Sequence, residues 1–365
     1  MSLLDSLHRL RTAYGDAPFT TGQASALGVP AHQLERATRN GQITRLRRGL
    51  YSAGKPLVTT AWSLACARAR EFHARGLPSV MSSSAGALLW DVPILAEPPP
   101  LPTIVVPRGA RPGSRGGVRI QLGVIDEADV VRLPVAHRHA GGRRVNDVRR
   151  ATPDQEEPRS DVYVVTSPLR TALDLGRETS LAPHLAAATM SMGLRRQIQW
   201  DEPHVITWDG HRMNIDEQRT DWACTQRIAD PHTREVIEAA LARCPRQGVR
   251  RVREALSMVQ PGVETPLEAV SWARMVQAGL PLPQTQTWLR GASGREYRVD
   301  FWWPEFGVIG EADGAVKYTS RVDIMREKSR QADLEIGGAR FIRWVWPDAV
   351  GPANFITRLR AAFAR

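Results

Sequence analysis

The sequence predicts an α+β protein of several domains. Its 365 residues correspond to two or three domains at roughly 100–200 residues each. A hydrophobic content of 42% is enough to form buried cores, which excludes a disordered chain. Helix-capping signals and short alternating strands follow one another, and turn-rich segments divide them. We expect domains at 1–58, 59–260 and 261–365.

The charge of the chain favours a polyanionic partner. It holds 49 basic and 38 acidic residues, for a net charge of +11 and an isoelectric point near 10.4. Basic surfaces bind nucleic acid by neutralising phosphates and releasing counterions, although many soluble proteins are also basic. Lysine occurs only at Lys55, Lys317 and Lys328, so arginine is the usual cation of this chain and each lysine is notable.

Several other classes of protein are disfavoured. No apolar run approaches the roughly 18 residues of a membrane span. The first residues lack the apolar stretch of a signal peptide. The three cysteines, Cys66, Cys224 and Cys244, are widely spaced, which argues against a disulfide framework or a cysteine zinc site. We therefore expect a cytoplasmic protein with no membrane partner.

The N-terminal block predicts two short helices followed by a hairpin. Thr21 is suited to cap the first helix, and Gly28 to end it in the left-handed conformation. Pro30 suits the first turn of a second helix that stops at Gly41. Residues 43–52 then alternate as two strands around an arginine-rich turn. Helix, turn, helix and hairpin wing is the order of a winged helix-turn-helix.

The second of these helices predicts a DNA-reading surface. Leu34 and Ala37 are placed to face the core, and polar residues to face outward. The residues of this helix and of the wing that suit base edges or phosphates are Gln33, Arg36, Arg39, Arg45, Arg47 and Arg48. The alternative is a basic, solvated pair of helices.

This block, GQASALGVPAHQLERATRNGQITRLRRGLY, also resembles the N-terminal winged helix of AbiEi-type antitoxins from abortive-infection systems. The resemblance implies DNA binding, often at the operon's own promoter. In the middle block, SSSAGALLWDVP and VTSPLRTALDLGR resemble the second domain of AbiEi-type proteins, which implies a mixed α/β domain and a cognate toxin protein as a partner.

The middle block holds no predicted catalytic constellation. Ser167 is suited to cap a helix that begins at Pro168. His137 and His139 share a face of a strand-like run, but satisfied or exposed histidines explain such a pair better than a metal site does.

Acidic residues are predicted to converge in the C-terminal block. A hairpin is expected over about 296–313. Asp300 lies in its otherwise apolar first strand, VDFWW, and Glu311 and Asp313 point to one face of the second strand. The hairpin places Asp300 across from that pair, and Glu268 lies in the first turn of the preceding helix.

Such a cluster predicts a metal site. Burying carboxylates together is unfavourable unless a cation neutralises them, and a hard divalent ion does so with oxygen ligands. We expect Mg²⁺ (or Mn²⁺) there, where it would activate water and stabilise charge on a phosphoryl group. Lys317 follows on the same side, and its compact charge suits a scissile phosphate. Chance and surface solvation are the alternative explanation of Lys317 and Lys328.

The same residues carry a resemblance to a nuclease family. Glu268, the segment VDFWWPEFGVIGEADGAVKY and the segment REKSRQADLEIGGARFIRWVW together resemble PD-(D/E)XK nucleases, near the very-short-patch mismatch repair endonucleases. The resemblance implies a restriction-endonuclease-like α/β domain in which Asp300 and Glu311 ligate metal. It further implies that Glu268 orients a metal-bound water and that Asp313 is an additional ligand or supporting group.

The chain departs from that family at one position. The signature places lysine two residues after the second acid, where this chain has Asp313, so Lys317 would have to substitute from the following turn. Two hypotheses follow. The first is a DNA-binding protein with a Mg²⁺-dependent endonuclease domain, in a prokaryotic defence or toxin–antitoxin setting. The alternative is an AbiEi-like antitoxin and transcriptional regulator with a catalytically inactive nuclease fold.

Overall fold

The computed structural model divides the chain into two compact units. The first comprises Met1–Leu175, Arg196–Asp221 and Ala239–Cys244, and the second comprises Gly176–Arg195, Trp222–Glu238 and Pro245–Arg365. The residues that the structure describes are 2–14, 18–53, 65, 68–69, 72, 76–97, 100–134, 162–178, 181–201, 206–208, 213–215, 232–314, 321–351 and 354–364. Helices and several sheets make the chain an α+β protein, as predicted. The division into three domains stays a prediction.

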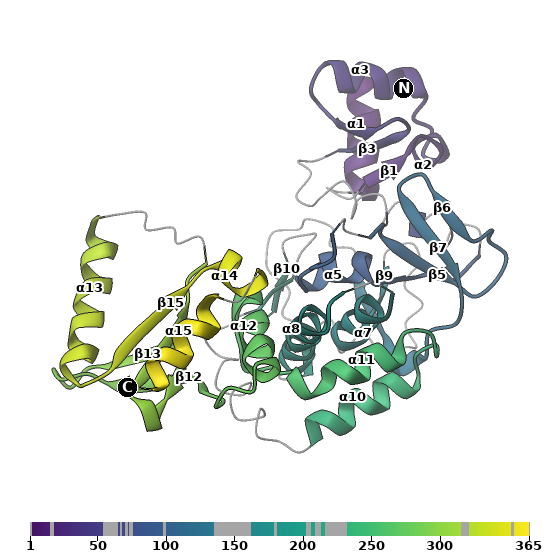
Figure 1. Cartoon of the computed structure of the whole chain (residues 1–365). Coiled ribbons are helices and arrows are strands. Elements are labelled where there is room, and N and C mark those ends of the chain that lie inside the picture. Colours follow the sequence, from purple (N-terminus) through teal and green to yellow (C-terminus); the bar gives the residue numbers. More distant parts are fainter. Residues whose placement is uncertain are drawn as a thin grey trace. The chain divides into compact units, whose positions relative to one another are not determined.

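Three helices and a small sheet form the N-terminal part of the first unit (Figure 1). The elements are α1 (Leu3–Tyr14), β1 (Pro18–Thr20), α2 (Thr21–Ala26), α3 (Ala31–Arg39), β2 (Thr44–Arg47) and β3 (Leu50–Ser52). The strands are antiparallel in the order β1-β3-β2, and the predicted hairpin of β2 and β3 is present. Leu10, Phe19 and Leu34 are among the residues of a core that the helices and the sheet share.

The start of α2 differs by one residue from the prediction. Thr20, rather than Thr21, caps the helix: its Oγ1 accepts a hydrogen bond from Gln23 N at 3.2 Å. The Gln23 side chain in turn accepts one from Thr20 N at 2.8 Å. This reciprocal capping box needs a Gln or Glu three residues after the cap, which selects Thr20 over Thr21. Gly28 follows the helix at φ 77°, in the left-handed conformation that was predicted.

A mixed six-stranded sheet also belongs to the first unit. Its order is β6-β7-β5-β4-β9-β8, with β5–β7 and β4–β9 parallel and the other pairs antiparallel. Its elements are β4 (Val80–Ser82), α5 (Ser84–Trp90), β5 (Thr103–Val106), β6 (Gly113–Arg115), β7 (Val118–Leu122), η1 (Glu127–Asp129), β8 (Val130–Pro134), β9 (Val162–Thr166) and α7 (Pro168–Glu178). The helix predicted to begin at Pro168 is confirmed. His137 and His139 lie outside the described residues.

The second unit contains a four-stranded sheet, and Figure 1 shows α12 and α13 on opposite sides of it. The order is β12-β13-β14-β15, in which only the β14–β15 pair is parallel. Its elements are α12 (Pro266–Gln277), β12 (Gln284–Arg290), β13 (Glu296–Trp303), η4 (Pro304–Phe306), β14 (Val308–Ala312), α13 (Arg321–Ile336), β15 (Arg340–Trp344), α14 (Trp346–Val350) and α15 (Asn354–Phe363). The predicted hairpin and the predicted helix over 321–336 are confirmed.

Aromatic side chains fix the packing of this sheet. Trp344 stacks on Phe301 and Phe355, and its Nε1 donates a hydrogen bond to Ser271 of α12 at 2.7 Å. Gly310 leaves room for these rings, because a Cβ atom there would lie 2.7 Å from Trp344. The residue after Gly310 is Glu311, so the tight packing holds one candidate acid in a defined position.

Further elements of the chain are α8 (Pro183–Asp201), β10 (Ile206–Trp208), β11 (Met213–Ile215), α10 (His232–Ala242), α11 (Val249–Ala255) and η3 (Leu256–Met258). β10 and β11 form an antiparallel pair. Within the described ranges, no helix combines the length and the apolar character that crossing a bilayer requires.

Candidate functional site

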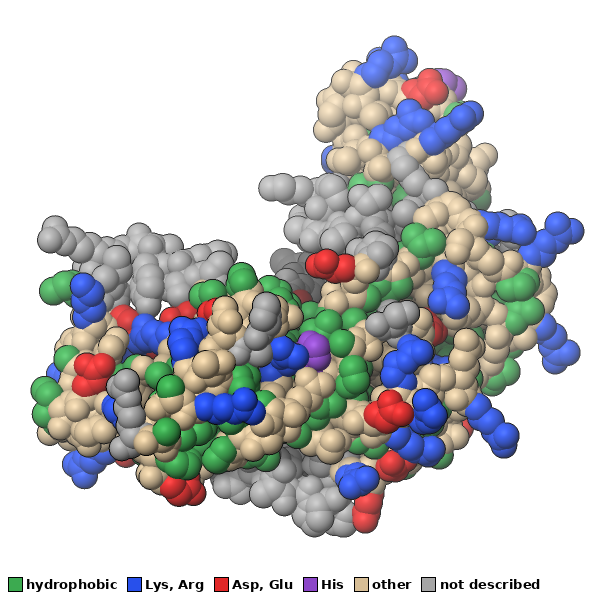
Figure 2. Space-filling model, in the orientation of Figure 1, with side chains coloured by type: hydrophobic (Ala, Val, Ile, Leu, Met, Phe, Trp, Pro, Cys, Tyr) green, Lys and Arg blue, Asp and Glu red, His purple; other side chains and the backbone are tan. Residues whose placement is uncertain are grey.

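The polar face of α3 is open to solvent. Leu34 and Ala37 are buried in the N-terminal core, whereas Arg36 and Arg39 are exposed on the same helix. One side of α3 therefore packs and the other presents two guanidinium groups. Figure 2 shows Lys and Arg side chains on the surface of this N-terminal part.

Gln33 lies differently from its prediction. It is half-buried, and its side-chain oxygen accepts a hydrogen bond from the Ser6 hydroxyl of α1. This contact turns Gln33 toward the protein instead of fully outward. The sequence could not indicate it, because the two residues are 27 positions apart.

The hairpin of β2 and β3 adds further cations. Arg45 on β2 and Arg48 in the turn are exposed. The turn is tied to α2, because Thr21 N donates a hydrogen bond to the Gly49 carbonyl at 3.1 Å. Arg47 ends β2, but its side chain is outside the described part of the structure. Both α3 and the hairpin thus present exposed arginines.

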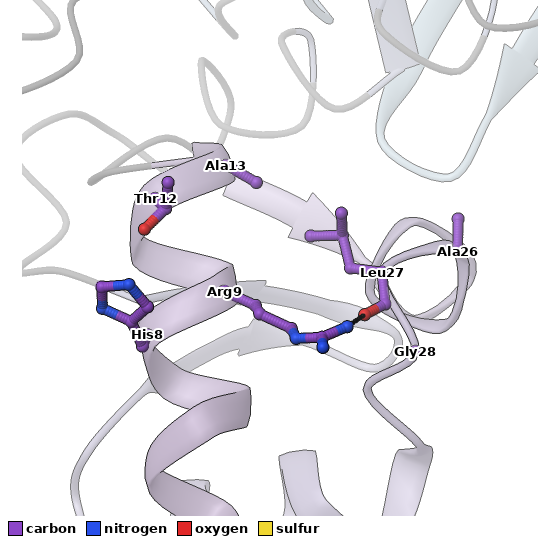
Figure 3. A pocket seen from close by; sticks show the side chains of 7 residues that line it. All are labelled: His8, Arg9, Thr12, Ala13, Ala26, Leu27 and Gly28. Carbon is purple, nitrogen blue, oxygen red and sulfur yellow. Dashed lines mark hydrogen bonds between the residues drawn. The ribbon is translucent and has the colours of Figure 1, made fainter. Parts of the chain in front are cut away.

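A pocket of about 650 Å³ lies between α1 and the end of α2 (Figure 3). Its lining residues are His8, Arg9, Thr12, Ala13, Ala26, Leu27 and Gly28. Arg9 Nη1 donates a hydrogen bond to the Leu27 carbonyl at 3.2 Å, where α2 ends. A cation at a helix C-terminus stabilises unpaired carbonyls there, so Arg9 supports the fold of this part.

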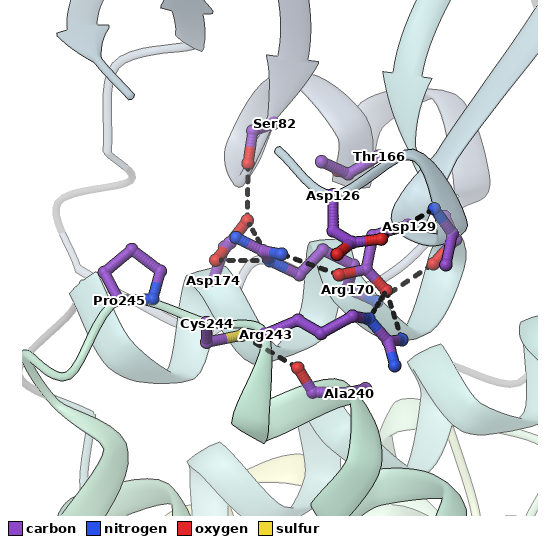
Figure 4. A network of polar contacts seen from close by, with 12 residues as sticks. Ser82, Asp126, Asp129, Thr166, Arg170, Asp174, Ala240, Arg243, Cys244 and Pro245 are labelled. Atoms are coloured by element: carbon purple, nitrogen blue, oxygen red, sulfur yellow. Dashed lines mark hydrogen bonds and ion pairs between the residues drawn. The ribbon is translucent and has the colours of Figure 1, made fainter. Parts of the chain in front are cut away.

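A buried ion-pair network lies in the first unit (Figure 4). Arg170 of α7 is 1% exposed; its Nη1 lies 2.7 Å from Asp129 Oδ2 and its Nε 3.1 Å from Asp174 Oδ1. Ser82 of β4 donates a hydrogen bond to Asp174 at 2.7 Å, and Arg243 pairs with Asp129. Although burial disfavours its charge, Asp174 and Asp129 hold the pKa of Arg170 above its ordinary value. The VTSPLRTALDLGR segment thus supplies an arginine and an aspartate to a network that ties together β4, η1, α7 and the residue after α10.

In the second unit, Glu268 is a buried acid at the start of α12. Its carboxylate accepts hydrogen bonds from Glu264 N at 2.9 Å, Thr265 Oγ1 at 2.7 Å and Gln286 Nε2 at 2.9 Å. Thr265 also caps α12, as its Oγ1 accepts from Glu268 N at 3.2 Å. Burial raises the pKa of Glu268, against the effect of these hydrogen bonds.

Phe301 of β13 pairs with Gly310 of β14 in antiparallel register. The neighbouring residues, Asp300 and Glu311, therefore lie opposite each other on the two strands. Asp300 Oδ2 accepts a hydrogen bond from Ala312 N at 3.0 Å. Burial and the nearby carboxylates of Glu268 and Glu311 raise the pKa of Asp300 to about 8. A carboxyl group with a pKa this high lies where positive charge is in deficit.

Glu311 is paired with two arginines that come from other elements. It is 6% exposed; Arg330 Nη2 of α13 contacts its Oε1, and Arg343 Nη2 of β15 lies 2.9 Å from its Oε2. Both arginines also contact Glu327 of α13. Burial nevertheless raises the pKa of Glu311. Asp313 is half-buried; its Oδ2 lies 3.8 Å from Arg343 Nη1, and burial raises its pKa as well.

The structure therefore gathers Glu268, Asp300 and Glu311 and adds residues that sequence reasoning missed. Glu327, Arg330 and Arg343 lie in the segment REKSRQADLEIGGARFIRWVW that carries the nuclease resemblance, but no role was predicted for them. Gln286 carries no local signal, because it meets Glu268 only through the tertiary fold. Lys317 lies outside the described residues, and Lys328 is exposed on α13.

The acids match the predicted divalent cation in their chemistry but not in their arrangement. Their chemistry suits a hard ion, since carboxylate oxygens are its usual ligands. Their arrangement does not: in the described part of the chain, no three His, Cys, Asp or Glu side chains are placed to hold an ion. Both oxygens of Glu268 and both of Glu311 are engaged by protein donors. The acids as placed here do not form a ready cation site.

Comparison with known proteins identifies relatives of parts of the chain. Residues 17–53 match a family described as "Transcriptional regulator, AbiEi antitoxin". The uncharacterized proteins MT2308 and Rv2248, from two strains of Mycobacterium tuberculosis, are each 32% identical over 101 residues. That match covers 28% of this chain and 37% of each relative, so the chain spans little more than a third of the curated proteins it resembles.

The family match confirms the AbiEi resemblance for the N-terminal segment alone. The matched residues hold α2, α3 and the β2–β3 hairpin, which present the exposed arginines. The AbiEi resemblance of the middle block and the nuclease resemblance of the C-terminal block stay predictions. The N-terminal segment is thus similar to transcriptional regulators of the AbiEi antitoxin type.

Proposed function

We propose that this chain is a DNA-binding regulator of the AbiEi type and that its N-terminal part is a winged helix-turn-helix. The observation that carries the proposal is the family match over residues 17–53, the same segment whose α3 buries Leu34 and Ala37 and exposes Arg36 and Arg39. The order of α2, α3 and the β2–β3 hairpin is that of the proposed motif.

In this proposal α3 lies in the major groove, where Arg36 and Arg39 meet base edges or phosphates. Arg45, Arg47 and Arg48 of the hairpin contact the phosphate backbone or the minor groove. Gln33 holds α3 on α1 through Ser6, so its contribution to DNA binding is through the position of the helix.

The test is binding to the DNA upstream of the protein's own reading frame, compared with a shuffled duplex. Arg36→Ala and Arg39→Ala should each cost about 1–3 kcal/mol of binding free energy if they contact bases. The control is Arg250→Ala, because Arg250 is 93% exposed and distant in sequence from the motif. Equal affinity of wild type and both α3 variants for the two duplexes would overturn the proposal.

A cognate toxin protein is part of this proposal as a partner. The resemblance of the SSSAGALLWDVP and VTSPLRTALDLGR segments to the second AbiEi domain supports it. Co-expression with the product of the adjacent gene should restore growth and give a co-purifying complex. Growth inhibition that this chain leaves unrelieved would remove the toxin from the proposal.

We propose phosphodiester hydrolysis as a second candidate function of the C-terminal sheet. The observation in its favour is the gathering of Glu268, Asp300 and Glu311, in which burial and the two neighbouring carboxylates raise the pKa of Asp300 to about 8. By the nuclease resemblance, Glu268, Asp300 and Glu311 would hold Mg²⁺ or Mn²⁺, with Asp313 and Lys317 in support. Because the acids are not arranged as a ready cation site, we assign these residues no reaction step.

The test is cleavage of supercoiled and linear DNA with Mg²⁺, with Mn²⁺ and with EDTA. The double variant Asp300→Ala, Glu311→Ala should lose any cation-dependent cleavage, and the control variant Arg250→Ala should retain it. Equal cleavage by wild type and the double variant would mean that a contaminating nuclease is responsible, and this candidate would be rejected.

A further inference from the structure

The β6–β7 ribbon is a short two-stranded hairpin at the edge of the six-stranded sheet. Arg115 is registered with Val118, so only Gly116 and Gly117 form the turn. These glycines have φ values of 59° and 82°, the positive values that a tight two-residue hairpin turn requires. β6 is paired only with β7 in the described sheet, so its other side is an open edge.

The ribbon and the bend before it carry charge of one sign. Residues 98–125 contain four arginines, no lysine and no acidic residue. Arg108, Arg111 and Arg115 are exposed, and Arg119 is half-buried on β7. Figure 2 shows basic side chains projecting where Figure 1 places β6 and β7.

These arginines differ from four other arginines of the first unit. Arg132, Arg170, Arg196 and Arg243 each pair with an acid in the described structure. Among the described residues, no ion pair is found for Arg108, Arg111 or Arg115. Three exposed guanidinium groups, one on β6 and two in the bend before it, form a surface without acids that a polyanion would neutralise.

The position of β6 makes these arginines accessible to such a partner. β7 pairs with β6 on one side and with β5 on the other, so β6 is an edge strand of the sheet. Arg115 is exposed on this edge strand, and Arg108 and Arg111 are exposed in the bend before it. Guanidinium groups contact phosphates in a bidentate manner, so these side chains suit the phosphate backbone of DNA.

We infer that the β6–β7 ribbon is a second DNA-contacting surface, which adds phosphate contacts to those of the N-terminal part. The inference rests on the proposed DNA-binding function. A competing physical explanation is that arginines on an open edge strand prevent edge-to-edge aggregation. The two explanations predict different results for DNA affinity and for solubility.

The experiment measures the affinity of the full chain for a fluorescent duplex of roughly 40 base pairs, about four helical turns, as a function of salt. The variant is Arg108→Gln, Arg111→Gln, Arg115→Gln. Its slope of log K against log[salt] should be shallower by about 0.9 for each phosphate that the variant no longer neutralises. The matched control removes three exposed arginines of the second unit, Arg234→Gln, Arg246→Gln, Arg250→Gln, and should leave the slope nearly unchanged.

The outcomes separate this inference from the function on which it rests. If wild type binds no DNA, the proposed function fails. If wild type binds, Arg36→Ala weakens binding and the ribbon variant keeps the slope of its control, the inference alone is overturned. The ribbon variant could instead aggregate while its soluble fraction binds DNA as wild type does. That result would mean that the arginines protect the edge strand, and it would overturn the inference as well. A shallower slope with a monomeric, folded variant supports it.

Discussion

Two buried polar clusters, one in each unit, reach opposite electrostatic states. In the first unit, Asp129 and Asp174 surround Arg170, and Arg243 adds a second guanidinium to Asp129. In the second unit, burial and neighbouring acids raise the pKa of Asp300 to about 8. The two arginines of the first cluster balance its two aspartates. In the second cluster, Arg330 and Arg343 pair with Glu311 and leave the carboxyl group of Asp300 without a cationic partner among the described residues.

The difference separates a structural cluster from a candidate site. Buried charges that satisfy one another fix the geometry of a fold and leave little capacity for a ligand. Carboxylates that remain uncompensated are instead unstable in their charged form, and a proton or a cation relieves them. The distinction comes from which arginines the fold brings to which acids.

The largest expected effect is on the balanced cluster. Arg170→Ala leaves two buried carboxylates without their shared partner and should cost about 3–5 kcal/mol of unfolding free energy. The control is Arg132→Ala, whose ion pair with Glu127 is exposed (56% and 72%) and should contribute less than about 1 kcal/mol. Urea unfolding measures both.

If Arg170→Ala does not fold, Arg170→Lys keeps the charge and removes the forked geometry, and its stability should lie between those of wild type and the alanine variant. Equal stabilities of the Arg170 and Arg132 variants would show that the first cluster is not a structural core.

The second cluster should respond in the opposite sense. The folded-state pKa of Asp300 is raised from 3.8 to about 8, so the folded protein holds an additional proton between these values. The stabilisation that comes from protonated Asp300 is complete below pH 3.8 and is lost as pH rises through 8. Asp300→Asn cannot ionise, so it should be more stable than wild type at pH 8, by up to a few kcal/mol, with a flatter pH profile.

The measurement is thermal unfolding from pH 4 to pH 9 in EDTA. Asp333→Asn is a control of opposite sign, because a Ser293 hydrogen bond lowers the pKa of Asp333 and its effect lies at acid pH. A variant at Asp300 that is less stable than wild type at pH 8 would mean that the charged form of Asp300 is needed by the fold.

The secondary structure of the C-terminal sheet was largely predictable, because its strands have strong local signals. The apolar VDFWW strand predicts β13, and a hairpin partner then sets Asp300 opposite Glu311. β12 was missed, since QTQTWLR is largely polar, and only Gln286 of its residues is buried. Thr20 was missed as a cap because Thr21 is an equally good capping residue and only the position of Gln23 decides.

The charge state of the candidate site was not predictable from sequence. Arg330 and Arg343 reach Glu311 from α13 and β15, and Gln286 reaches Glu268 from β12. Hydrophobic periodicity indicates which face of a strand is buried, but it carries no information on which charged groups meet there. The predicted metal site followed from the acids alone, without the arginines that the fold supplies.

The second candidate function requires that a divalent cation bind at the second cluster and not at the first, although the acids as placed do not form a ready cation site. If Mn²⁺ or Mg²⁺ displaces the proton of Asp300, the unfolding free energy at pH 8 should rise by about 2.7 kcal/mol when the cation is present at one hundred times its dissociation constant. The midpoint of thermal unfolding should rise accordingly. Asp300→Asn should lose this stabilisation and Asp129→Asn should keep it, each relative to its own metal-free state. If the cation stabilises wild type and Asp300→Asn equally, the ion binds elsewhere. Ca²⁺ serves as a control for non-specific charge screening.

The smallest effect tests how complete the balance of the first cluster is. Ser82→Ala removes a neutral donor that lies 2.7 Å from Asp174, while Arg170 Nε still contacts both oxygens of that carboxylate. Because the charge of Asp174 stays compensated, the loss should be about 1 kcal/mol and nearly independent of pH. Thr265→Ala is the corresponding change in the second cluster: it removes the cap of α12, and Glu268 loses the 2.7 Å hydrogen bond from Thr265, so the pKa of Glu268 should rise further. The stability of that variant should therefore fall more steeply with pH than that of Ser82→Ala, and parallel pH profiles of the two variants would remove the distinction between the clusters.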